Sequence, residues 1–384
     1  MTFALPLETP PMEAQSAEVL PEAGGLWQYE PKWDGFRCIA FKADDTVDLR
    51  TKSGKPLGRY FPEVVAFLQQ MPIKQFVVDG ELVIEVDGRL AFDALQARLH
   101  PAASRIRKLA AETPARFIAF DILVDPHGVA LLDRPLRDRR QMLERFMAQA
   151  DTLKQLIISP ATQEVGQARF WLNDAGHGAI DGVIAKLLTD AYAPGERRMI
   201  KVKHLRTADC VIGGFRYQSR RREVGSLLLG LYNAAGELDH VGFTSAIADS
   251  ERAALTRRLE KLRKPPGFTG KAPGGPSRWS TERSGEWEPL QPDLVVEVRF
   301  DHVTGDRFRH GTTLIRWRPD KAPRQCTFEQ IAPVAADPAT SAASDTECGD
   351  QKSEERSWLF RNLFFSVQHA NSFGFGWRKR GSRL

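Results

Sequence analysis

The chain has 384 residues, a length that predicts two domains. Its 42% apolar and 27% charged residues are typical of a soluble globular protein, and its formal net charge of +5 permits a polyanionic partner without requiring one. The first 25 residues lack the basic and apolar regions of a signal peptide, and no apolar stretch is long enough to span a bilayer. The four cysteines have neither a disulfide nor a zinc-site spacing. These features exclude a membrane-spanning protein and predict a cytoplasmic one.

The first half of the chain mixes predicted strands and helices irregularly. We expect residues 1–25 to form a loose, Pro-rich arm. After it we expect strands at 26–41, 46–51, 75–92 (broken at Asp87-Gly88), 181–188 and 198–205, and a hairpin at 115–131. Helical periodicity predicts helices at 61–70, 92–99 and 133–149, the last with Asp133 as its N-cap. This mixture favours an α+β domain over residues 26–205.

The pattern changes near residue 206. Short strands with turn signals and one predicted helix (249–264) suit a small OB-type β-barrel over residues 206–335. The run "SRRRE" (219–223) is either a solvated loop or a phosphate contact. Residues 336–384 begin with an acidic, Ser- and Ala-rich stretch, and we expect this tail to be disordered and dispensable for catalysis.

Residues 28–41, "QYEPKWDGFRCIAF", place Lys32 among strand-forming residues just before Asp34-Gly35. Taken alone, this is an ordinary solvated lysine beside a turn. Other short segments follow in order: "VVDGE" ending at Glu81, "FIAFD" with Phe120, "DGVIAK" with Asp181 and Lys186, "IKVK" with Lys201 and Lys203 on one strand face, and "RWRPDK". Each is unremarkable by itself, and the order and spacing of the set carry the information.

In this order the segments resemble the covalent nucleotidyltransferases, which include ATP-dependent DNA ligases and mRNA capping enzymes. The resemblance is closest to the small bacterial ATP-dependent DNA ligases of the LigC type and covers roughly residues 11–332. The matching segments are "YEPKWDGFR", "RTKSGKPLGRYFPE", "VVDGELV", "FIAFDIL", "DGVIAK", "MIKVKHLRTADCVIGGF" and "FDHVTGDRFRHGTTLIRWRPDK". The resemblance implies an adenylation domain followed by the OB-type barrel.

The resemblance also implies the chemistry. Lys32 would attack the α-phosphorus of ATP and form a lysyl–AMP bond, although a free lysine, with a pKa of about 10.4, is mostly protonated at neutral pH. Lys201 and Lys203 would offset the charge that develops on the α-phosphate. Arg318 and Lys321 would meet the β- and γ-phosphates when the barrel closes over the site.

The remaining implied roles concern the nucleotide, the metal and the DNA end. Phe120 would stack on adenine, Glu30 would lie near the adenine edge, and Arg37 and Glu81 would hold the ribose. The other expected nucleotide-binding residues are Arg50 and Lys186. Asp181, assisted by Glu81, would bind Mg²⁺ or Mn²⁺. Two positions depart from the family pattern: Asp181 replaces a glutamate, and Lys52 replaces an arginine and loses its bidentate phosphate contact.

We therefore expect an ATP-dependent DNA ligase that seals nicked duplex DNA as a monomer, in DNA repair and with possible repair-protein partners. Two alternatives remain open from the sequence. One is a capping guanylyltransferase, which would use GTP and RNA ends. The other is a nick-binding module without catalytic activity, although the presence of Lys32, Glu81, Lys201 and Lys203 argues against it.

Overall fold

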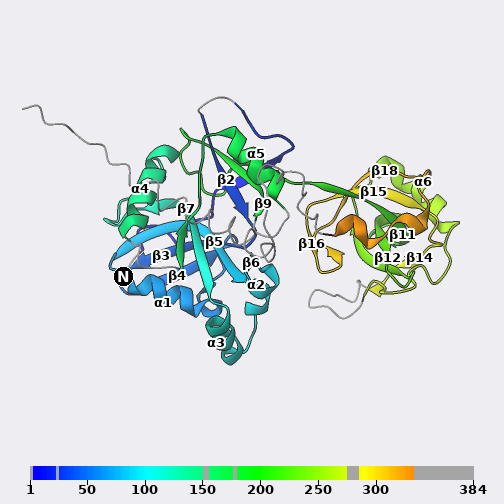
Figure 1. Cartoon of the computed structure of the whole chain (residues 1–384), viewed down its shortest axis with the longest axis horizontal. Helices are drawn as coiled ribbons and strands as arrows, with labels where there is room; N and C mark the ends of the chain where they lie inside the picture. Colours follow the sequence, from blue (N-terminus) through cyan, green and yellow to red (C-terminus); the bar gives the residue numbers. More distant parts are fainter. Residues whose placement is uncertain (1–2, 23–25, 150–154, 176–179, 275–284, 333–384) are drawn as a thin grey trace, which may run out of the picture. The chain divides into compact units, whose positions relative to one another are not determined.

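The computed structural model describes residues 3–22, 26–149, 155–175, 180–274 and 285–332. The chain forms two compact units, one within Met1–Val202 and the other within Lys203–Ala336. Figure 1 shows the helices and strands of both. The α+β unit followed by an OB-type barrel agrees with the expected fold class. The domain limits expected from the sequence, 26–205 and 206–335, stay predictions, and the expected tail lies outside the described residues.

The first unit is built on two sheets. One has the strand order β1-β10-β9-β2, and the other has the order β4-β3-β5-β7-β8, with β6 attached to β5. The strands are β1 (Glu13–Ala17), β2 (Trp27–Trp33), β3 (Phe36–Ala43), β4 (Thr46–Thr51), β5 (Gln75–Val86), β6 (Arg89–Leu90), β7 (Ala115–Val124), β8 (Leu156–Ile158), β9 (Ile180–Leu187) and β10 (Arg197–Lys203). The helices are α1 (Pro62–Gln70), α2 (Phe92–Arg98), α3 (Ala103–Glu112), α4 (Leu136–Gln149) and α5 (Val165–Asp174).

Strand β5 is buried on both faces, which explains its nearly continuous apolar sequence. Because side chains alternate along a strand, Val78, Leu82 and Ile84 share one face and join the core formed with α1 and α4. Val77 and Val83 lie on the other face and pack against residues of the first sheet. Asp79 and Glu81 therefore belong to the face that is directed toward the first sheet.

The N-terminal arm was expected to be loose, and for residues 3–22 this was wrong. Residues 13–17 form β1, which pairs in parallel with β10. Met12 is 3% exposed, and Phe3, Leu5 and Leu7 pack against the same core cluster. A Pro-rich composition is compatible with an ordered segment when neighbouring strands supply its hydrogen-bond partners.

Two other expectations need correction. Helix α4 begins at Leu136, because the carbonyl of Pro135 rather than Asp133 accepts its first amide hydrogen bonds. The expected hairpin at 115–131 has one strand, β7, and its return arm makes only an isolated bridge between Val124 and Ala130. The sequence reading also missed β1, β8, α3 and α5.

The second unit is the OB-type barrel. It contains β11 (Arg206–Tyr217), β12 (Val224–Tyr232), β13 (Leu238–Thr244), β14 (Glu288–Pro289), β15 (Val295–Phe300), β16 (Val303–Thr304), β17 (Arg307–Phe308), β18 (Thr313–Trp317) and α6 (Asp249–Glu260). The main sheet has the order β13-β12-β11-β15-β18. A bridge between Thr244, the last residue of the edge strand β13, and Thr312, the residue before the other edge strand β18, brings the two edges of the sheet together. Leucine, valine and isoleucine side chains from these strands fill the interior.

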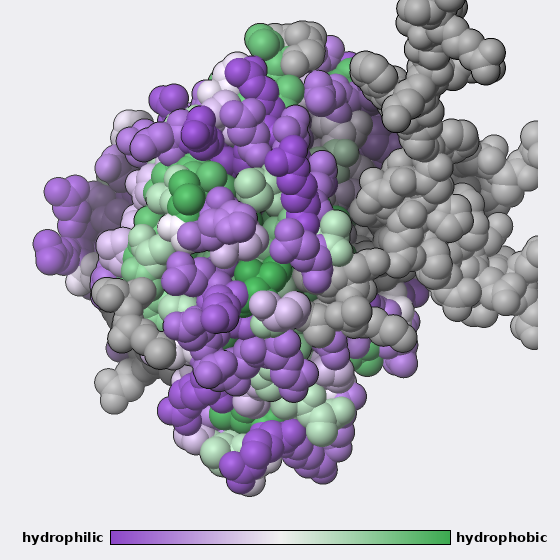
Figure 2. Space-filling view, turned by 90° about the vertical axis from the view of Figure 1, so that its left-hand side faces the viewer, coloured by the Kyte–Doolittle hydropathy of each residue, from purple (hydrophilic) through white to green (hydrophobic). Residues whose placement is uncertain are grey.

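The face of the molecule in Figure 2 is mostly hydrophilic, with hydrophobic residues in small separate spots. Such scattered apolar residues are normal on a solvated surface. Within the part of the chain that the structure describes, no helix has the length and apolar character needed to cross a membrane.

Candidate active site

Lys32 lies at the centre of the candidate site in the first unit. It is near the end of β2, opposite Gly182 of β9, at a point where the register of the two strands shifts. Its Nζ donates a hydrogen bond to Asp181 Oδ2 at 2.7 Å, and the two side chains are 23% and 8% exposed. The pair joins residues 149 positions apart in the chain. The lysine is thus held in a defined place but remains reachable from solvent.

Two glycines next to the site are required by close packing. A Cβ at Gly35 would lie 2.2 Å from the carbonyl oxygen of Leu82 and 2.8 Å from Cγ of Glu81. A Cβ at Gly80 would lie 2.3 Å from the ring of Phe117. The Asp-Gly pair after Lys32, read from the sequence as a turn signal, therefore also lets the backbone approach β5.

Arg37 is held by a partner that the sequence reading missed, Asp79. It donates two hydrogen bonds to this buried carboxylate, both at 2.6 Å. The hydroxyl of Tyr192 donates a third at 2.6 Å and in turn accepts one from the amide of Met12. These contacts raise the pKa of Arg37 above its ordinary value against the opposing effect of burial. Asp79 thus orients the arginine that was expected to hold the ribose.

Glu81 lies directly across from Arg37 in the register of β3 and β5. Burial raises the pKa of Glu81 from 4.5 to about 7, although the positive charges of Arg37 and Lys32 act in the opposite direction. A carboxyl with this pKa exchanges its proton near neutral pH. Such perturbed groups are characteristic of functional sites.

Phe120 is flanked by two cations. The guanidinium carbon of Arg37 is 4.4 Å from the ring centroid, and Nζ of Lys186 is 4.8 Å from it. Lys186 also donates to Glu30 Oε1 at 2.8 Å, in an ion pair whose side chains are only 4% and 3% exposed. Gln28 donates to the same oxygen at 2.7 Å. The structure therefore brings Phe120, Glu30, Lys186 and Arg37 together, as the resemblance implies for one nucleotide pocket.

The acidic residues suit a hard divalent cation. Mg²⁺ at nucleotide sites usually takes one or two carboxylates and completes its shell with phosphate oxygens and water. Asp181 and Glu81 offer such oxygens. Among the described residues there is no group of three or more His, Cys, Asp or Glu side chains arranged to hold a metal ion. The donor set therefore fits an ion that shares its ligands with bound phosphates.

The two lysines of the "IKVK" segment belong to different units. Lys201 lies on β10, in the same sheet as Lys32 and Asp181. Lys203 is the last residue of β10, and its Nζ donates to Asp301 Oδ2 at 2.6 Å in the second unit. Asp301 also lies 3.0 Å from Nδ1 of His310, and these two hydrogen bonds lower the pKa of its carboxyl. The sequence reading did not identify Asp301.

Arg318 and Lys321 lie in the second unit and share a partner, Asp209. Arg318 donates to Asp209 at 2.7 Å and to Asp320 at 2.8 Å, while Nζ of Lys321 is 3.6 Å from Asp209. The hydrogen bonds to Asp320 raise the pKa of Arg318, and the same contact lowers the pKa of Asp320 to about 2. Asp209 was also missed, because it stands 109 positions before Arg318.

Arg50 and Lys52 are engaged at the edge of the first unit. Arg50 donates to both carboxylate oxygens of Asp48, at 2.6 and 3.0 Å, and to the carbonyl of Gly54. Lys52 pairs with Glu13 at 3.0 Å and is 59% exposed. Glu13 belongs to β1, so the ordered N-terminal segment reaches the position where the family pattern has an arginine.

Comparison with known proteins shows the family of the chain. Residues 11–203 match the family described as ATP dependent DNA ligase domain, and residues 220–321 match the ATP dependent DNA ligase C terminal region. The chain is 41% identical over 338 residues to DNA ligase C1 of Mycolicibacterium smegmatis. This alignment covers 85% of this chain and 95% of the relative. It is 41% identical over 348 residues to DNA ligase C of Mycobacterium tuberculosis, with the same coverage.

A solved structure from a study of Lig E DNA ligases has a similar fold, with a TM-score of 0.51 at 18% identity. The structural match covers 80% of this chain and 99% of the solved chain. The length and identity of the sequence matches, together with the fold, establish the family. The chain belongs to the ATP-dependent DNA ligases, among which it resembles the small bacterial LigC type.

Proposed function

We propose that this ligase seals nicks in duplex DNA in three steps through a lysyl–AMP intermediate on Lys32. The observation that supports it best is the position of Lys32, which is partly exposed, hydrogen-bonded to Asp181 at 2.7 Å and within electrostatic range of Glu81. Around it lie an aromatic ring and the charged groups that a nucleotide requires. The acceptor of AMP is the 5′-phosphate at the nick.

In the first step the Lys32 amine attacks the α-phosphorus of ATP. A P–N bond forms, the bond to the β-phosphate oxygen breaks, and pyrophosphate leaves. An ammonium has no free lone pair, so a proton must leave before attack. Asp181 Oδ2 accepts a hydrogen bond from Nζ and therefore orients the amine. A Mg²⁺ ion held at Asp181 would offset the negative charge of the phosphates.

The nucleotide would be held by the residues around Phe120. The Arg37 guanidinium, fixed by Asp79, and the Glu81 carboxyl are both suited to hydrogen-bond the ribose hydroxyls. Adenine would stack on the Phe120 ring, whose surroundings include Arg37 and Lys186 within 5 Å of the centroid.

In the second step AMP passes to the 5′-phosphate, and in the third the 3′-hydroxyl attacks that phosphate and releases AMP. Arg318 and Lys321 would bind the β- and γ-phosphates during the first step only, because pyrophosphate is absent afterwards. Lys201 and Lys203 would contact the phosphate that receives attack. We further propose that the enzyme is a cytoplasmic monomer that acts in DNA repair, where repair proteins are its possible partners.

The test is incubation with labelled ATP and Mg²⁺, followed by acid treatment and by nick sealing. Wild-type protein should form an acid-labile AMP adduct and seal the nick. Lys32→Ala and Lys32→Arg should form none, since a guanidinium stays protonated. Lys74→Ala, at an exposed lysine of the same unit, is the matched control. An adduct on the Lys32→Arg protein would refute the assignment of the nucleophile.

A capping guanylyltransferase is the second candidate from the sequence, and the family membership does not favour it. It would transfer label from GTP and leave ATP unused. Nick sealing on duplexes with deoxyribonucleotide or ribonucleotide ends would in addition show which polynucleotide end the ligase prefers.

A further inference from the structure

A chain of buried hydrogen bonds connects the N-terminal segment (residues 3–22) to Arg37, the arginine proposed for the ribose. The backbone amide of Met12 donates to the hydroxyl oxygen of Tyr192 at 2.9 Å, and this hydroxyl donates to Asp79 Oδ2 at 2.6 Å. Asp79 in turn accepts two hydrogen bonds from Arg37. Met12 and Tyr192 are 3% exposed and Asp79 is 0% exposed, so water does not compete for these contacts. The carbonyl of Met12 completes the circuit by accepting a bond from Arg37 Nη2 at 3.3 Å.

The same contacts determine which N–H groups of Arg37 remain for a ligand. A guanidinium carries five N–H donors. Nε uses one on Asp79 Oδ1, and Nη2 uses its two on Asp79 Oδ2 and on the carbonyl of Met12. Within the described part of the chain, Nη1 has no hydrogen-bond partner. Its two N–H groups are therefore the ones that can bind neighbouring hydroxyl oxygens, such as the 2′ and 3′ oxygens of a ribose.

Tyr192 is held in place and keeps its proton. Its backbone amide donates to the carbonyl of Leu132 at 2.8 Å, and the guanidinium carbon of Arg139 lies 5.6 Å from its ring centroid. Burial and the nearby charge of Asp79 raise the pKa of Tyr192 well above its ordinary value. The hydroxyl is therefore a permanent donor to Asp79 Oδ2, and it restricts the rotation of the carboxylate that orients Arg37.

Met12 is also fixed before any nucleotide binds. The amide of Gly195 donates to the carbonyl of Pro11, the residue before Met12, at 3.2 Å. Nearer the start of the segment, the ring of Phe3 makes an edge contact with the ring of Phe41, with centroids 5.9 Å apart. The part of the N-terminal segment that precedes β1 thus places the amide and the carbonyl of Met12 against the side chains that they contact.

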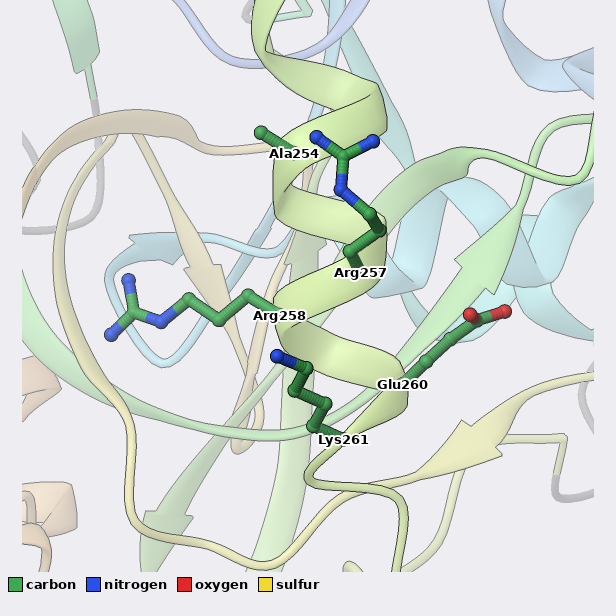
Figure 3. Close-up of a pocket in the computed structure, with 5 residues that line it drawn as sticks. All are labelled: Ala254, Arg257, Arg258, Glu260 and Lys261. Atoms are coloured by element: carbon green, nitrogen blue, oxygen red, sulfur yellow. The ribbon is translucent and has the colours of Figure 1, made fainter.

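The open hollow along α6 in the second unit is not suited to nucleoside recognition. Figure 3 shows its side chains extending from one helix, with Arg258 and Glu260 on opposite sides. Among the described residues, those that line the hollow include no aromatic ring on which a base could stack; they are Ala254, Arg257, Arg258, Glu260 and Lys261. Nucleoside selection is therefore sought in the first unit.

We propose that the Tyr192 hydroxyl and the backbone of Met12 are positioning groups of the nucleotide site, and that through Arg37 they determine its preference for a nucleotide with ribose hydroxyls. This inference rests on the proposed function, in which Arg37 holds the ribose. Both groups act through Asp79 and Arg37 rather than by contact with the nucleotide. A donor that is already oriented loses less conformational entropy on binding, which raises affinity. The N-terminal segment is thus a working part of the nucleotide site.

The test compares Tyr192→Phe, which removes only the hydroxyl, with Tyr29→Phe as the matched control. Tyr29 lies in the same unit and is also 3% exposed, but its hydroxyl donates to the carbonyl of Pro21 and its ring belongs to another core cluster. Formation of the AMP adduct from labelled ATP gives kcat and KM. The affinity for 2′,3′-dideoxy-ATP, which lacks both ribose hydroxyls, is measured as its inhibition constant against labelled ATP.

We expect Tyr192→Phe to raise the KM for ATP about three- to tenfold, because Arg37 would occupy its binding position for a smaller fraction of the time. The kcat should stay within about twofold of wild type, since the hydroxyl acts on binding and not on the reacting atoms. The inhibition constant of dideoxy-ATP should change by less than about twofold, because this nucleotide lacks the oxygens that Arg37 would bind. Tyr29→Phe should leave both constants at their wild-type values.

A double-mutant cycle separates positioning from general support of the pocket. Arg37→Lys removes the forked guanidinium on which Tyr192 would act. In this background Tyr192→Phe should have little further effect on the KM for ATP, because the two residues act as one unit. The same fold-change in both backgrounds would overturn the proposal.

Amide hydrogen exchange tests the proposal without any change at Tyr192. The Lys32→Ala protein, which should bind nucleotide without forming the adduct, is saturated with ATP or with dideoxy-ATP. The amide of Met12 should exchange several-fold more slowly with ATP, because hydroxyls that hold Arg37 would also stabilise the hydrogen bonds connected to it.

Three further results would overturn the proposal. The first is an unchanged KM for ATP in Tyr192→Phe. The second is an equal loss of affinity for ATP and dideoxy-ATP, which would indicate an effect on the base or the phosphates. The third is equal exchange of the Met12 amide with the two nucleotides. Failure of the proposed function is distinguishable, because it would appear as a wild-type protein that forms no AMP adduct from ATP.

Discussion

Glu81 is expected to reduce the stability of the enzyme at neutral and alkaline pH. In the folded chain its pKa is raised to about 7, while in the unfolded chain it has its ordinary value of 4.5. Between these values the folded state holds a proton that the unfolded state has lost. Stability therefore falls as the pH rises from about 4.5 to about 7 and remains lower above that range. Glu81→Gln removes this titration while conserving the shape of the side chain.

The size of the effect follows from the shift. A shift from 4.5 to about 7 corresponds to at most about 3.4 kcal/mol. Glu81 is only partly buried, and solvent screening reduces this figure to about 1–2 kcal/mol. The contributions of Arg37 and Lys32 are already contained in the net pKa. Glu81→Gln should thus unfold at higher urea concentration than wild type at pH 8 and at the same concentration at pH 5.

The assay is urea unfolding at pH 5, 6, 7 and 8, with midpoints compared at constant slope. Because the chain has two units, amide hydrogen exchange of β5 should be measured in parallel to follow the first unit by itself. The AMP adduct is measured on the same samples. The stabilised variant should form it at least tenfold more slowly, because it has lost the carboxylate proposed for the ribose and the metal.

Glu85→Gln is the control, since Glu85 lies on the same strand and pairs with Arg116 at 2.8 Å. It should not become more stable at high pH. If Glu81→Gln were no more stable than wild type at pH 8, the burial of this carboxyl would not be the origin of its raised pKa, and the argument would be refuted.

Three further predictions concern other residues. Lys42 donates to three carbonyl oxygens near the end of α1 at 2.7–2.9 Å, so Lys42→Met should lose about 1–3 kcal/mol of stability; an unchanged melting temperature would contradict this. Arg318→Ala should slow adenylation at least tenfold more than sealing of pre-adenylated nicked DNA, and equal losses in both assays would place Arg318 elsewhere. Asp301→Asn should free Lys203 from its ion pair and speed adenylation about two- to fivefold at subsaturating ATP; slower adenylation would show that Asp301 assists the lysine.

The sequence by itself predicted part of the local elements and named the candidate residues of the site. Strand alternation and turn residues predicted β2, β3, β5 and β9, because hydrophobic periodicity and turn chemistry act within a few residues. The order of the short motifs identified the family before any contact was known. The residues proposed around the nucleotide, Lys32, Phe120 and Lys186 among them, were all named from these segments.

Only the tertiary structure decided the partners of these residues. Lys32 meets Asp181 across 149 positions, Tyr192 meets Asp79 across 113, and Lys203 meets Asp301 across 98. Such pairs depend on the strand order and register of the sheets, which no local pattern encodes. An aspartate in a strand looks the same whether it faces solvent or orients an arginine.

The N-terminal segment shows the same limit. Its prolines and short apolar runs carry too little periodicity to predict a strand, yet β1 is ordered because β10 offers its free edge. The raised pKa of Glu81 likewise arises from burial between chain segments and not from its neighbours in sequence. Local chemistry therefore determined which residues are available to the site. Long-range packing determined which of them meet, and in what state of protonation.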